Sequence, residues 1–158
     1  MMSYFMQSPV GLIGLNEEDG FITALFFASA GEEAGESRTD VPPVVELAVR
    51  QLEEYFDKRR EVFCLPLRLK GTEFQKRVWS ALLEIPYGET RSYKEIAAAT
   101  GNANASRAVG LANNRNPISI IVPCHRVIGS NGKLVGYGGG LAAKQKLLDL
   151  ELKSHPRE

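Results

Sequence analysis

The sequence predicts an α+β fold, with a small N-terminal α+β unit packed on a mainly helical C-terminal half. Three observations indicate this arrangement. Two strand-prone apolar runs flank an Asp-Gly turn within residues 9–28, which is the pattern of a β-hairpin. Apolar residues spaced three or four positions apart mark one helix over 45–56 and another from 74 to 82. Further short helical segments follow in the second half.

Charge divides the chain in the same way as the predicted elements. Residues 1–70 contain 7 Lys and Arg side chains against 12 Asp and Glu, and residues 71–158 contain 12 against 7. We therefore expect two domains with these boundaries, the second of which can face a polyanion. Ordinary variation in surface charge explains the asymmetry equally well, since the net charge of the whole chain is zero.

The bulk composition excludes several classes of protein. The 158 residues are 44% hydrophobic and 24% charged, a globular balance. No apolar stretch approaches the roughly 18 residues of a membrane helix, and the N-terminal MMSYFMQSPV has no features of a signal peptide. Cys64 and Cys124 are too few for a disulfide framework, so we expect a reducing, cytoplasmic compartment.

The rest of the first unit is predicted as a loop, a helix and an extended segment. Residues 31–40 are rich in glycine and acidic side chains, which indicates an exposed loop ending at Asp40, a candidate helix cap. Two prolines then suit the first helical turn. The buried stripe of this helix is predicted to comprise Val45, Val49, Leu52 and Phe56. Apolar residues alternate over 62–69, where Pro66 favours an edge strand or a bulge.

The second half begins with a series of short helices. Thr72 opens the first with a capping-box pattern, and Ser92 opens another in the sequence SYKE. The helix that Ser92 opens is expected to run through Ala99 and to stop at Gly101, because glycine readily adopts the left-handed conformation of a helix end. A further helix follows over about 103–113. Two short helices joined by a tight, glycine-containing turn match the helix-turn-helix pattern.

The helix-turn-helix pattern has two interpretations. Pairs of short helices are common structural elements, and spacing alone favours that interpretation. However, the helix predicted over about 103–113 consists mostly of Ala, Gly, Ser and Asn, with Arg107 as its one long cation. Such a helix can approach a surface closely but lacks the side chains that read base edges in the major groove. As a nucleic-acid binder it would have little sequence preference, for example in the minor groove.

A cysteine follows an apolar run that is predicted as a buried strand. The run occupies residues 118–123, and Cys124 and His125 come immediately after it. The thiolate is the nucleophilic form of cysteine, and a nearby histidine can act as its base or as a stabilising cation. The alternatives are a small buried hydrophobe and a hydrogen-bonded core histidine. The other histidine, His155, lies in the polar tail, so we expect no metal site.

Three further features surround this cysteine in the sequence. An Asn-Pro turn places Asn116 before the predicted strand. Six glycines within residues 129–140, three of them consecutive and close to Tyr137, suit a flexible loop or the close approach of backbone to a flat ligand. A final helix over 141–152 carries Glu151, which can orient an imidazole or simply face solvent.

Several motifs, in order, resemble those of the O6-alkylguanine-DNA alkyltransferases. The string IVPCHRVIG, with an asparagine eight residues before its cysteine and GYGGGL after it, resembles the active-site signature of that family. RSYKEIA, GN and SRAVGLA resemble its helix-turn-helix. The resemblance covers residues 71–152 closely, whereas the first unit is similar in element order only. It implies an antiparallel sheet plus helix in the first unit and a winged helix-turn-helix-like DNA-binding element in the second.

The resemblance also implies a role for each residue of the site. Cys124 would be the alkyl acceptor, His125 the water-linked base, Glu151 its orienting partner and Asn116 the organiser of the cysteine turn. The residues that the resemblance assigns to DNA binding are Ser92, Tyr93, Ala105, Ser106 and Arg107, the last as a finger that replaces the extruded base. The residues that it assigns to the substrate pocket are Tyr93, Val127, Tyr137, Gly138 and Gly139.

The function implied is the irreversible transfer of alkyl groups from O6-alkylguanine in DNA to Cys124, once per molecule, after base flipping. O4-alkylthymine is a second candidate substrate. The implied partner is double-stranded DNA, with no membrane partner, no cofactor and a monomeric state. The first half has one cysteine and no histidine, so we expect no structural zinc. Similar proteins often carry Asn and Ser where this chain has Gly136 and Gly138, which implies a roomier pocket.

Two other functions fit parts of the pattern. Alkyltransferase-like proteins recognise lesions without removing them, but that class replaces the acceptor cysteine, which is present here as Cys124. A cysteine hydrolase with a Cys-His-Glu triad would use the same residue types and would turn over.

Overall fold

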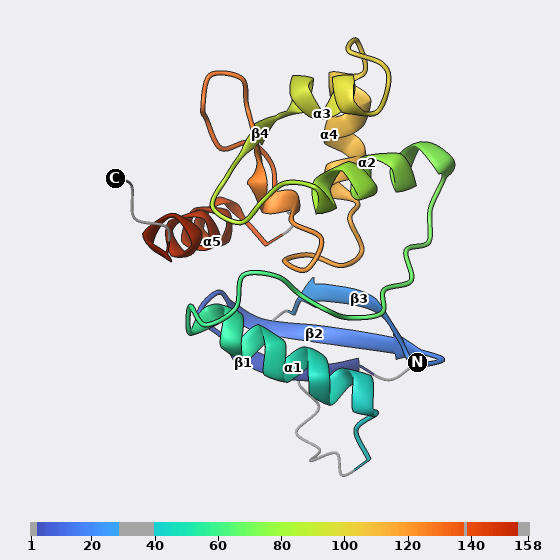
Figure 1. The fold of residues 1–158 in the computed structure, drawn as a ribbon, viewed down its shortest axis with the longest axis vertical. Coiled ribbons are helices and arrows are strands. Elements are labelled where there is room, and N and C mark those ends of the chain that lie inside the picture. Colours follow the sequence, from blue (N-terminus) through green and yellow to red (C-terminus); the bar gives the residue numbers. More distant parts are fainter. Residues whose placement is uncertain (1–2, 29–39, 138, 155–158) are drawn as a thin grey trace.

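The computed structural model describes residues 3–28, 40–137 and 139–154 and places them in two layers (Figure 1). One layer is an antiparallel sheet with a helix against it, and its elements are β1 (Ser3–Ser8), β2 (Gly11–Glu18), β3 (Phe21–Phe27) and α1 (Pro43–Phe56). The other layer is mainly helical, and its elements are α2 (Glu73–Leu83), β4 (Arg91–Ser92), α3 (Tyr93–Ala99), α4 (Ser106–Asn114), the 3-10 helix η1 (Cys124–Arg126), β5 (Val127–Ile128) and α5 (Leu141–Ser154). The predicted α+β class is confirmed.

The predicted hairpin is present as β2 and β3. Asp19 and Gly20 form its turn with φ angles of 54° and 85°, the left-handed conformation that both central residues of a type I′ turn require. The sheet order is β1-β2-β3, and Ser3 lies opposite Asn16 in the β1–β2 pairing. The sequence pattern does not predict β1, because SYFMQS has no clear apolar alternation.

Helix α1 begins after two prolines rather than at an acidic cap. Its N-cap is Pro42, whose carbonyl accepts from the amides of Val45 at 3.0 Å and Glu46 at 3.1 Å, with no side-chain cap. The prediction that Asp40 caps this helix is therefore wrong: Asp40 lies two residues too early. Val45 and Leu52 of the predicted stripe are fully buried, together with Ala48 and Tyr55, whereas Val49 and Phe56 are partly buried. Of the predicted loop, residues 31–39 lie outside the described residues.

The segment 62–69 is extended but forms only an isolated bridge. Leu67 pairs parallel with Ile22 of β3. The Ile22 amide donates to the Pro66 carbonyl at 2.9 Å, and the Arg68 amide donates to the Ile22 carbonyl at 3.0 Å. Pro66 fits because the bridge uses its carbonyl and needs no amide from it. The predicted edge strand is thus reduced to one bridge.

Local capping chemistry fixes the starts of α2 and α3. Thr72 and Gln75 form the predicted capping box, with the Gln75 amide donating to the Thr72 hydroxyl at 3.1 Å and the reverse contact at 2.9 Å. Ser92 and Glu95 repeat this arrangement at α3. Gly101 follows α3 with a φ of 99°, as predicted for a helix end.

Helix α4 starts later than predicted. It begins at Ser106, not near 103, because the preceding residues form a turn centred on Asn102. The Asn102 side chain accepts from the Asn104 amide at 3.0 Å, and its carbonyl accepts from the Ala105 amide at 3.0 Å. Asparagine side chains commonly compete with helix formation in this way.

The predicted buried strand at 118–123 is wrong. Ile118 forms one parallel bridge with Leu25, and the chain then turns, with Ile120 in the left-handed region at a φ of 71°. The Val122 amide donates back to the Ile118 carbonyl at 3.0 Å, which closes the turn. All four β-branched residues of this loop are buried in the core, so burial rather than strand pairing accounts for the apolar run.

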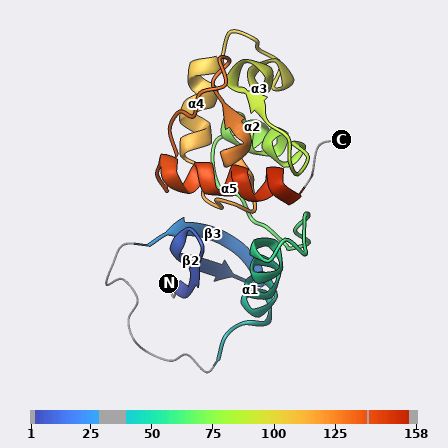
Figure 2. The same ribbon diagram turned by 90° about the vertical axis from the view of Figure 1, so that its left-hand side faces the viewer.

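The two layers share one hydrophobic core. Beside the bridge, the Leu25 amide donates to the Pro117 carbonyl at 2.9 Å, and the Ser119 amide donates to the Leu25 carbonyl at 3.1 Å. In Figure 2, α5 runs along the side of the helical layer that faces β3. No helix among the described residues is long and apolar enough to cross a membrane.

Candidate active site

Cys124 is the first residue of η1 and is 3% exposed. Its amide donates to the Val122 carbonyl at 2.8 Å, and its carbonyl accepts from the Asn113 side chain at 3.3 Å. Burial raises the pKa of the thiol, and hydrogen bonding from Asn116 and Ser119 opposes that shift. The resting form at neutral pH is therefore the protonated thiol.

Asn116 holds the turn that carries this cysteine. Its side-chain amide donates to the Val122 carbonyl at 2.8 Å, and its side-chain oxygen accepts from the Ile118 amide at 3.0 Å. One side chain thus bonds both ends of the loop before Cys124. This arrangement brings Asn116 and Cys124 together, as the sequence predicts.

His125 and Glu151 also meet, although 26 residues separate them in the sequence. His125 Nε2 lies 2.7 Å from Glu151 Oε2, and both side chains are buried. Burial lowers the pKa of His125, with Glu151 opposing the shift, so the imidazole is neutral at neutral pH. A carboxylate only accepts hydrogen bonds, so Nε2 carries the proton and Nδ1 keeps a lone pair. No group in the described part of the chain bonds Nδ1.

Arg126 forms a second buried ion pair with Glu151. Its Nε donates to Glu151 Oε1 at 2.8 Å and its Nη2 donates to Oε2 at 3.0 Å, a bidentate contact. Burial favours a higher pKa for Glu151, but the facing His125 and the Arg126 guanidinium outweigh it and lower the pKa to about 2. Glu151 is therefore ionised. Sequence reasoning gives Arg126 no role, although it stands inside the PCHRV string.

A buried lysine of α5 holds the glycine-rich loop that precedes this helix. Lys144 of α5 has no exposed surface, and its Nζ donates to the Val135 carbonyl at 2.9 Å. Burial lowers the pKa of Lys144 to about 8. The Tyr93 hydroxyl donates to the same Val135 carbonyl at 2.9 Å. Sequence reasoning misses Lys144; its spacing of seven residues from Glu151, which places both on one face of α5, is the signal that could have found it.

The predicted pocket residues lie close to this loop. Tyr137 packs edge-on against Phe27 of β3, with ring centroids 5.6 Å apart. A Cβ on Gly139 would meet the Phe27 ring at 2.7 Å, so glycine is required for this approach. Val127 is fully buried in β5, opposite Arg91. Gly138 lies outside the described residues.

A cavity of about 260 Å³ opens beside the cysteine. It lies between β3 and the turn that follows α4, and its lining residues include Phe26, Phe27, Asn114, Ser119 and Cys124. Of the residues predicted for the pocket, Tyr93, Val127, Tyr137 and Gly139 do not border it. The thiol is thus reached through a recess to which the N-terminal sheet contributes aromatic side chains.

The predicted DNA-binding residues gather on α3 and α4, which pack side by side (Figure 1). Arg107 is exposed in the first turn of α4. The remaining predicted residues are partly exposed: Ser92, Tyr93, Ala105 and Ser106. Tyr93 links this surface to the cysteine site, because its hydroxyl bonds the loop that Lys144 holds.

The fold and the site together define a class of protein, a helix-turn-helix protein that holds a buried cysteine beside an imidazole–carboxylate pair. Two family models match the chain. One is described as 6-O-methylguanine DNA methyltransferase, DNA binding domain, and matches residues 73–153. The other is described as 6-O-methylguanine DNA methyltransferase, ribonuclease-like domain, and matches residues 1–69. The chain belongs to the 6-O-methylguanine DNA methyltransferase family.

Individual relatives agree with this assignment along nearly their whole length. The methylated-DNA–protein-cysteine methyltransferase of Methanosarcina barkeri is 52% identical, over 92% of this chain and 94% of that protein. The protein of the same name from Mycolicibacterium paratuberculosis is 51% identical, over 96% and 92%. The crystal structure of Mycobacterium tuberculosis OGT in complex with DNA is 49% identical, with a TM-score of 0.85 over 96% of this chain and 93% of that chain.

Proposed function

We propose that this protein repairs double-stranded DNA by transferring an alkyl group from O6 of guanine to Sγ of Cys124. The observation that carries the proposal is the buried thiol at the start of η1, next to a histidine that a buried carboxylate orients. The site lies in the half of the chain that also contains the helix-turn-helix. The methyltransferases named above supply the reaction class.

The chemistry is a direct displacement on the alkyl carbon. The bond between sulfur and carbon forms as the bond between carbon and O6 breaks, which leaves a thioether on Cys124. The thiol proton passes to Nδ1 of His125 through a water molecule, and the released guanine takes up a proton as it returns to its keto form. No oxidant or cofactor enters the balance. The thioether is stable, so each molecule acts once.

The pKa directions at the site favour proton transfer during the displacement rather than before it. Burial raises the pKa of Cys124 and lowers that of His125, so thiol and imidazole are both neutral at rest. As the thiol loses its proton, His125 becomes positive and faces an ionised Glu151. The carboxylate thus stabilises the charge that appears only as the reaction proceeds.

DNA handling falls to α3 and α4. A base inside a duplex cannot reach a buried thiol, so the target nucleotide must be extruded at a cost of a few kcal/mol. We assign Arg107 as the side chain that enters the vacated stack, and Tyr93 as a contact of the extruded nucleotide. Ser92, Ala105 and Ser106 would contact the DNA around it. Binding would depend little on sequence, because α4 offers few groups that read base edges.

The organisation of the chain follows from this assignment. We propose that residues 1–70 form a companion domain and that residues 71–158 bind DNA and carry out the transfer, with the protein acting as a monomer. The acceptor must remain a free thiol, which fits a reducing compartment such as the cytoplasm. Cys64 and Cys124 are both free.

Incubation with a duplex containing O6-methylguanine tests the function against its rivals. We expect each molecule to gain one methyl group, about 14 Da, on Cys124 and then to stop. Retention of the lesion without any gain of mass would mark a lesion-binding protein. Release of product over many cycles would mark a hydrolase. Either result would overturn the proposal.

Glu151→Gln is expected to slow alkyl transfer and to raise the apparent pKa of the Cys124 thiol. An amide stabilises a positive imidazole less than a carboxylate does, and a hydrogen bond to a charged group is worth about 1.5–3 kcal/mol, so the rate should fall by about 10- to 100-fold. Single-turnover rates with free O6-benzylguanine, measured across pH, report this effect. Unchanged rate–pH profiles in both Glu151→Gln and His125→Ala would rule the relay out.

The same substitution should also reduce stability, because it leaves the buried Arg126 guanidinium without its carboxylate. Breaking a buried ion pair in this way costs about 3–5 kcal/mol. Urea unfolding should therefore precede the kinetics, and rates should be compared only where both proteins are folded. Asp149→Asn is the matched control. It removes a carboxylate from the same helix, and that carboxylate accepts from the Gln145 side chain and does not bond the histidine.

A further inference from the structure

The N-terminal unit contributes a side chain to the network around His125. Tyr55 is the penultimate residue of α1 and is fully buried. Its hydroxyl donates to Glu151 Oε2 at 2.6 Å, across 96 residues of sequence. A hydroxyl that donates to a carboxylate at this distance forms a strong, charge-assisted hydrogen bond. The carboxylate that orients the histidine is therefore held from the opposite layer of the molecule.

Both oxygens of Glu151 are engaged by fixed groups. Oε2 faces the Tyr55 hydroxyl at 2.6 Å, His125 Nε2 at 2.7 Å and Arg126 Nη2 at 3.0 Å. Oε1 accepts from Arg126 Nε at 2.8 Å. Two segments far apart in the sequence, the end of α1 and the helix η1, thus set the plane of the carboxylate. The direction in which Glu151 holds His125 depends on both of them.

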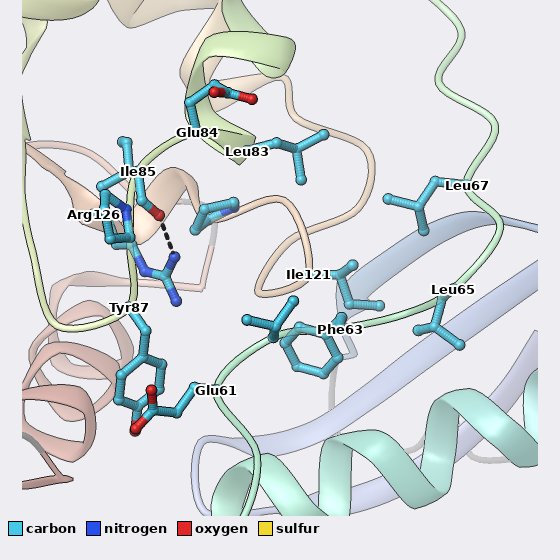
Figure 3. Close-up of a pocket in the computed structure, with 13 residues that line it drawn as sticks. Glu61, Phe63, Leu65, Leu67, Leu83, Glu84, Ile85, Tyr87, Ile121 and Arg126 are labelled. Carbon is cyan, nitrogen blue, oxygen red and sulfur yellow. Dashed lines mark hydrogen bonds between the residues drawn. The ribbon is translucent and has the colours of Figure 1, made fainter.

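The ring of Tyr55 is fixed by aromatic packing at the seam between the layers. It contacts Phe56 and Phe63, each with centroids 5.3 Å away, and Tyr87 of the other layer at 6.1 Å. Figure 3 shows Tyr87 and Arg126 on one side of a cavity of about 220 Å³ at this seam and Phe63 on the other. Arg126 is tied there to the Ile85 carbonyl at 2.7 Å. A ring so confined leaves its hydroxyl little freedom to move.

We propose that Tyr55 is a positioning residue for alkyl transfer, holding Glu151 in the orientation that presents His125 to the thiol. The inference rests on the proposed function and extends its site into the N-terminal unit. Tyr55 touches neither sulfur nor substrate and acts through the carboxylate. Burial and the charge of Glu151 raise the pKa of Tyr55 well above 10, so it remains a donor throughout the working pH range.

Removal of the hydroxyl has a defined electrostatic sign. The titratable or charged groups that act on the His125–Glu151 pair or on Tyr55 are Tyr87, Arg126, Tyr137 and Lys144. All of them remain in Tyr55→Phe. The carboxylate then interacts more strongly with His125, because one competing donor is gone, and the pKa of His125 should rise. Transfer should nevertheless slow, because the carboxylate is less firmly oriented.

The test compares two Tyr→Phe substitutions in the N-terminal unit. Tyr55→Phe deletes the hydroxyl that bonds Glu151, whereas Tyr4→Phe deletes a hydroxyl from β1. In the full-length protein with free O6-benzylguanine, we expect Tyr55→Phe to react about tenfold more slowly and Tyr4→Phe to react close to the wild-type rate. Nitrogen NMR of the imidazole should show a raised His125 pKa in Tyr55→Phe alone. In a Glu151→Gln background, Tyr55→Phe should cause little further loss.

Equal losses in the two variants, or an unchanged His125 pKa in Tyr55→Phe, would reduce Tyr55 to a packing residue and overturn the inference. Should Tyr55→Phe not fold, 3-fluorotyrosine placed at position 55 keeps the hydroxyl as a stronger donor. It should lower the His125 pKa, and no shift would count against the inference. A wild-type protein that takes no benzyl group would refute the proposed function itself. Wild-type transfer with an unaffected Tyr55→Phe would refute only the role of Tyr55.

Discussion

Cys124→Ser is expected to abolish alkyl transfer while the protein still binds methylated duplex DNA. A serine hydroxyl is almost never ionised near neutral pH and is a far weaker nucleophile toward carbon, so the rate should fall by about 10³-fold or more. The substitution is close in size and should fit the buried position in η1. Mass spectrometry of the intact protein after exposure to O6-methylguanine duplex measures the loss directly.

Cys64→Ser is the matched control for this prediction. Cys64 is exposed, and its backbone amide and carbonyl are held by the Gln51 side chain at 2.9 and 3.1 Å, so the substitution leaves those contacts in place. We expect full activity and one methyl group on Cys124, located by peptide mapping. A methyl group on Cys64, or transfer by Cys124→Ser, would show that the acceptor has been assigned wrongly.

Arg107→Ala should slow repair of duplex DNA but leave reaction with a free base nearly unchanged. Without a side chain to fill the vacated stack, the unstacking cost of a few kcal/mol is uncompensated, which corresponds to about 10- to 100-fold in rate. Free O6-benzylguanine needs no extrusion, so its reaction with Cys124 should proceed at about the wild-type rate. The ratio of the two rates is the quantity to measure.

Arg115→Ala provides the comparison for charge. Arg115 is also exposed and caps the other end of α4, so its removal deletes the same charge from the same helix. It should weaken DNA binding in a salt-dependent way without changing the ratio between duplex and free base. If Arg107→Ala lowers both rates equally, Arg107 supports the pocket or the fold, and its role as a finger must be abandoned.

Much of the fold could be predicted because its signals are local. The capping boxes at Thr72 and Ser92 and the Asp19-Gly20 turn are each encoded within four residues, and the structure confirms all three. The run at 118–123 shows where such reasoning fails. Its β-branched residues predict a strand, but the side chain of Asn116 and the bridge to Leu25 impose a turn. Those contacts are invisible to a periodicity argument.

The candidate site also contains residues that local sequence predicts and residues that it does not. Cys124 and His125 stand side by side in the sequence, and their residue types alone suggest a nucleophile and a base. The groups that surround Glu151 could not be found in this way, because they converge only in three dimensions. Arg126 is a neighbour in sequence, but its partner is 25 residues away, and Tyr55 is 96 residues from Glu151. Long-range hydrogen bonds leave no periodic trace in a single sequence.

The bridge between Leu25 and Ile118 bears on how the two halves of the protein can change over evolution. The loop that ends in Cys124 is hydrogen-bonded to the backbone of β3, so a substitution that bends this strand would displace the thiol. Mutations in the sheet would then be selected through the rate of repair as well as through folding. A chimaera that joins this N-terminal unit to the C-terminal half of a distant relative would mismatch strand and loop. Substitutions in β3 and in the loop before Cys124 are therefore expected to depend on one another.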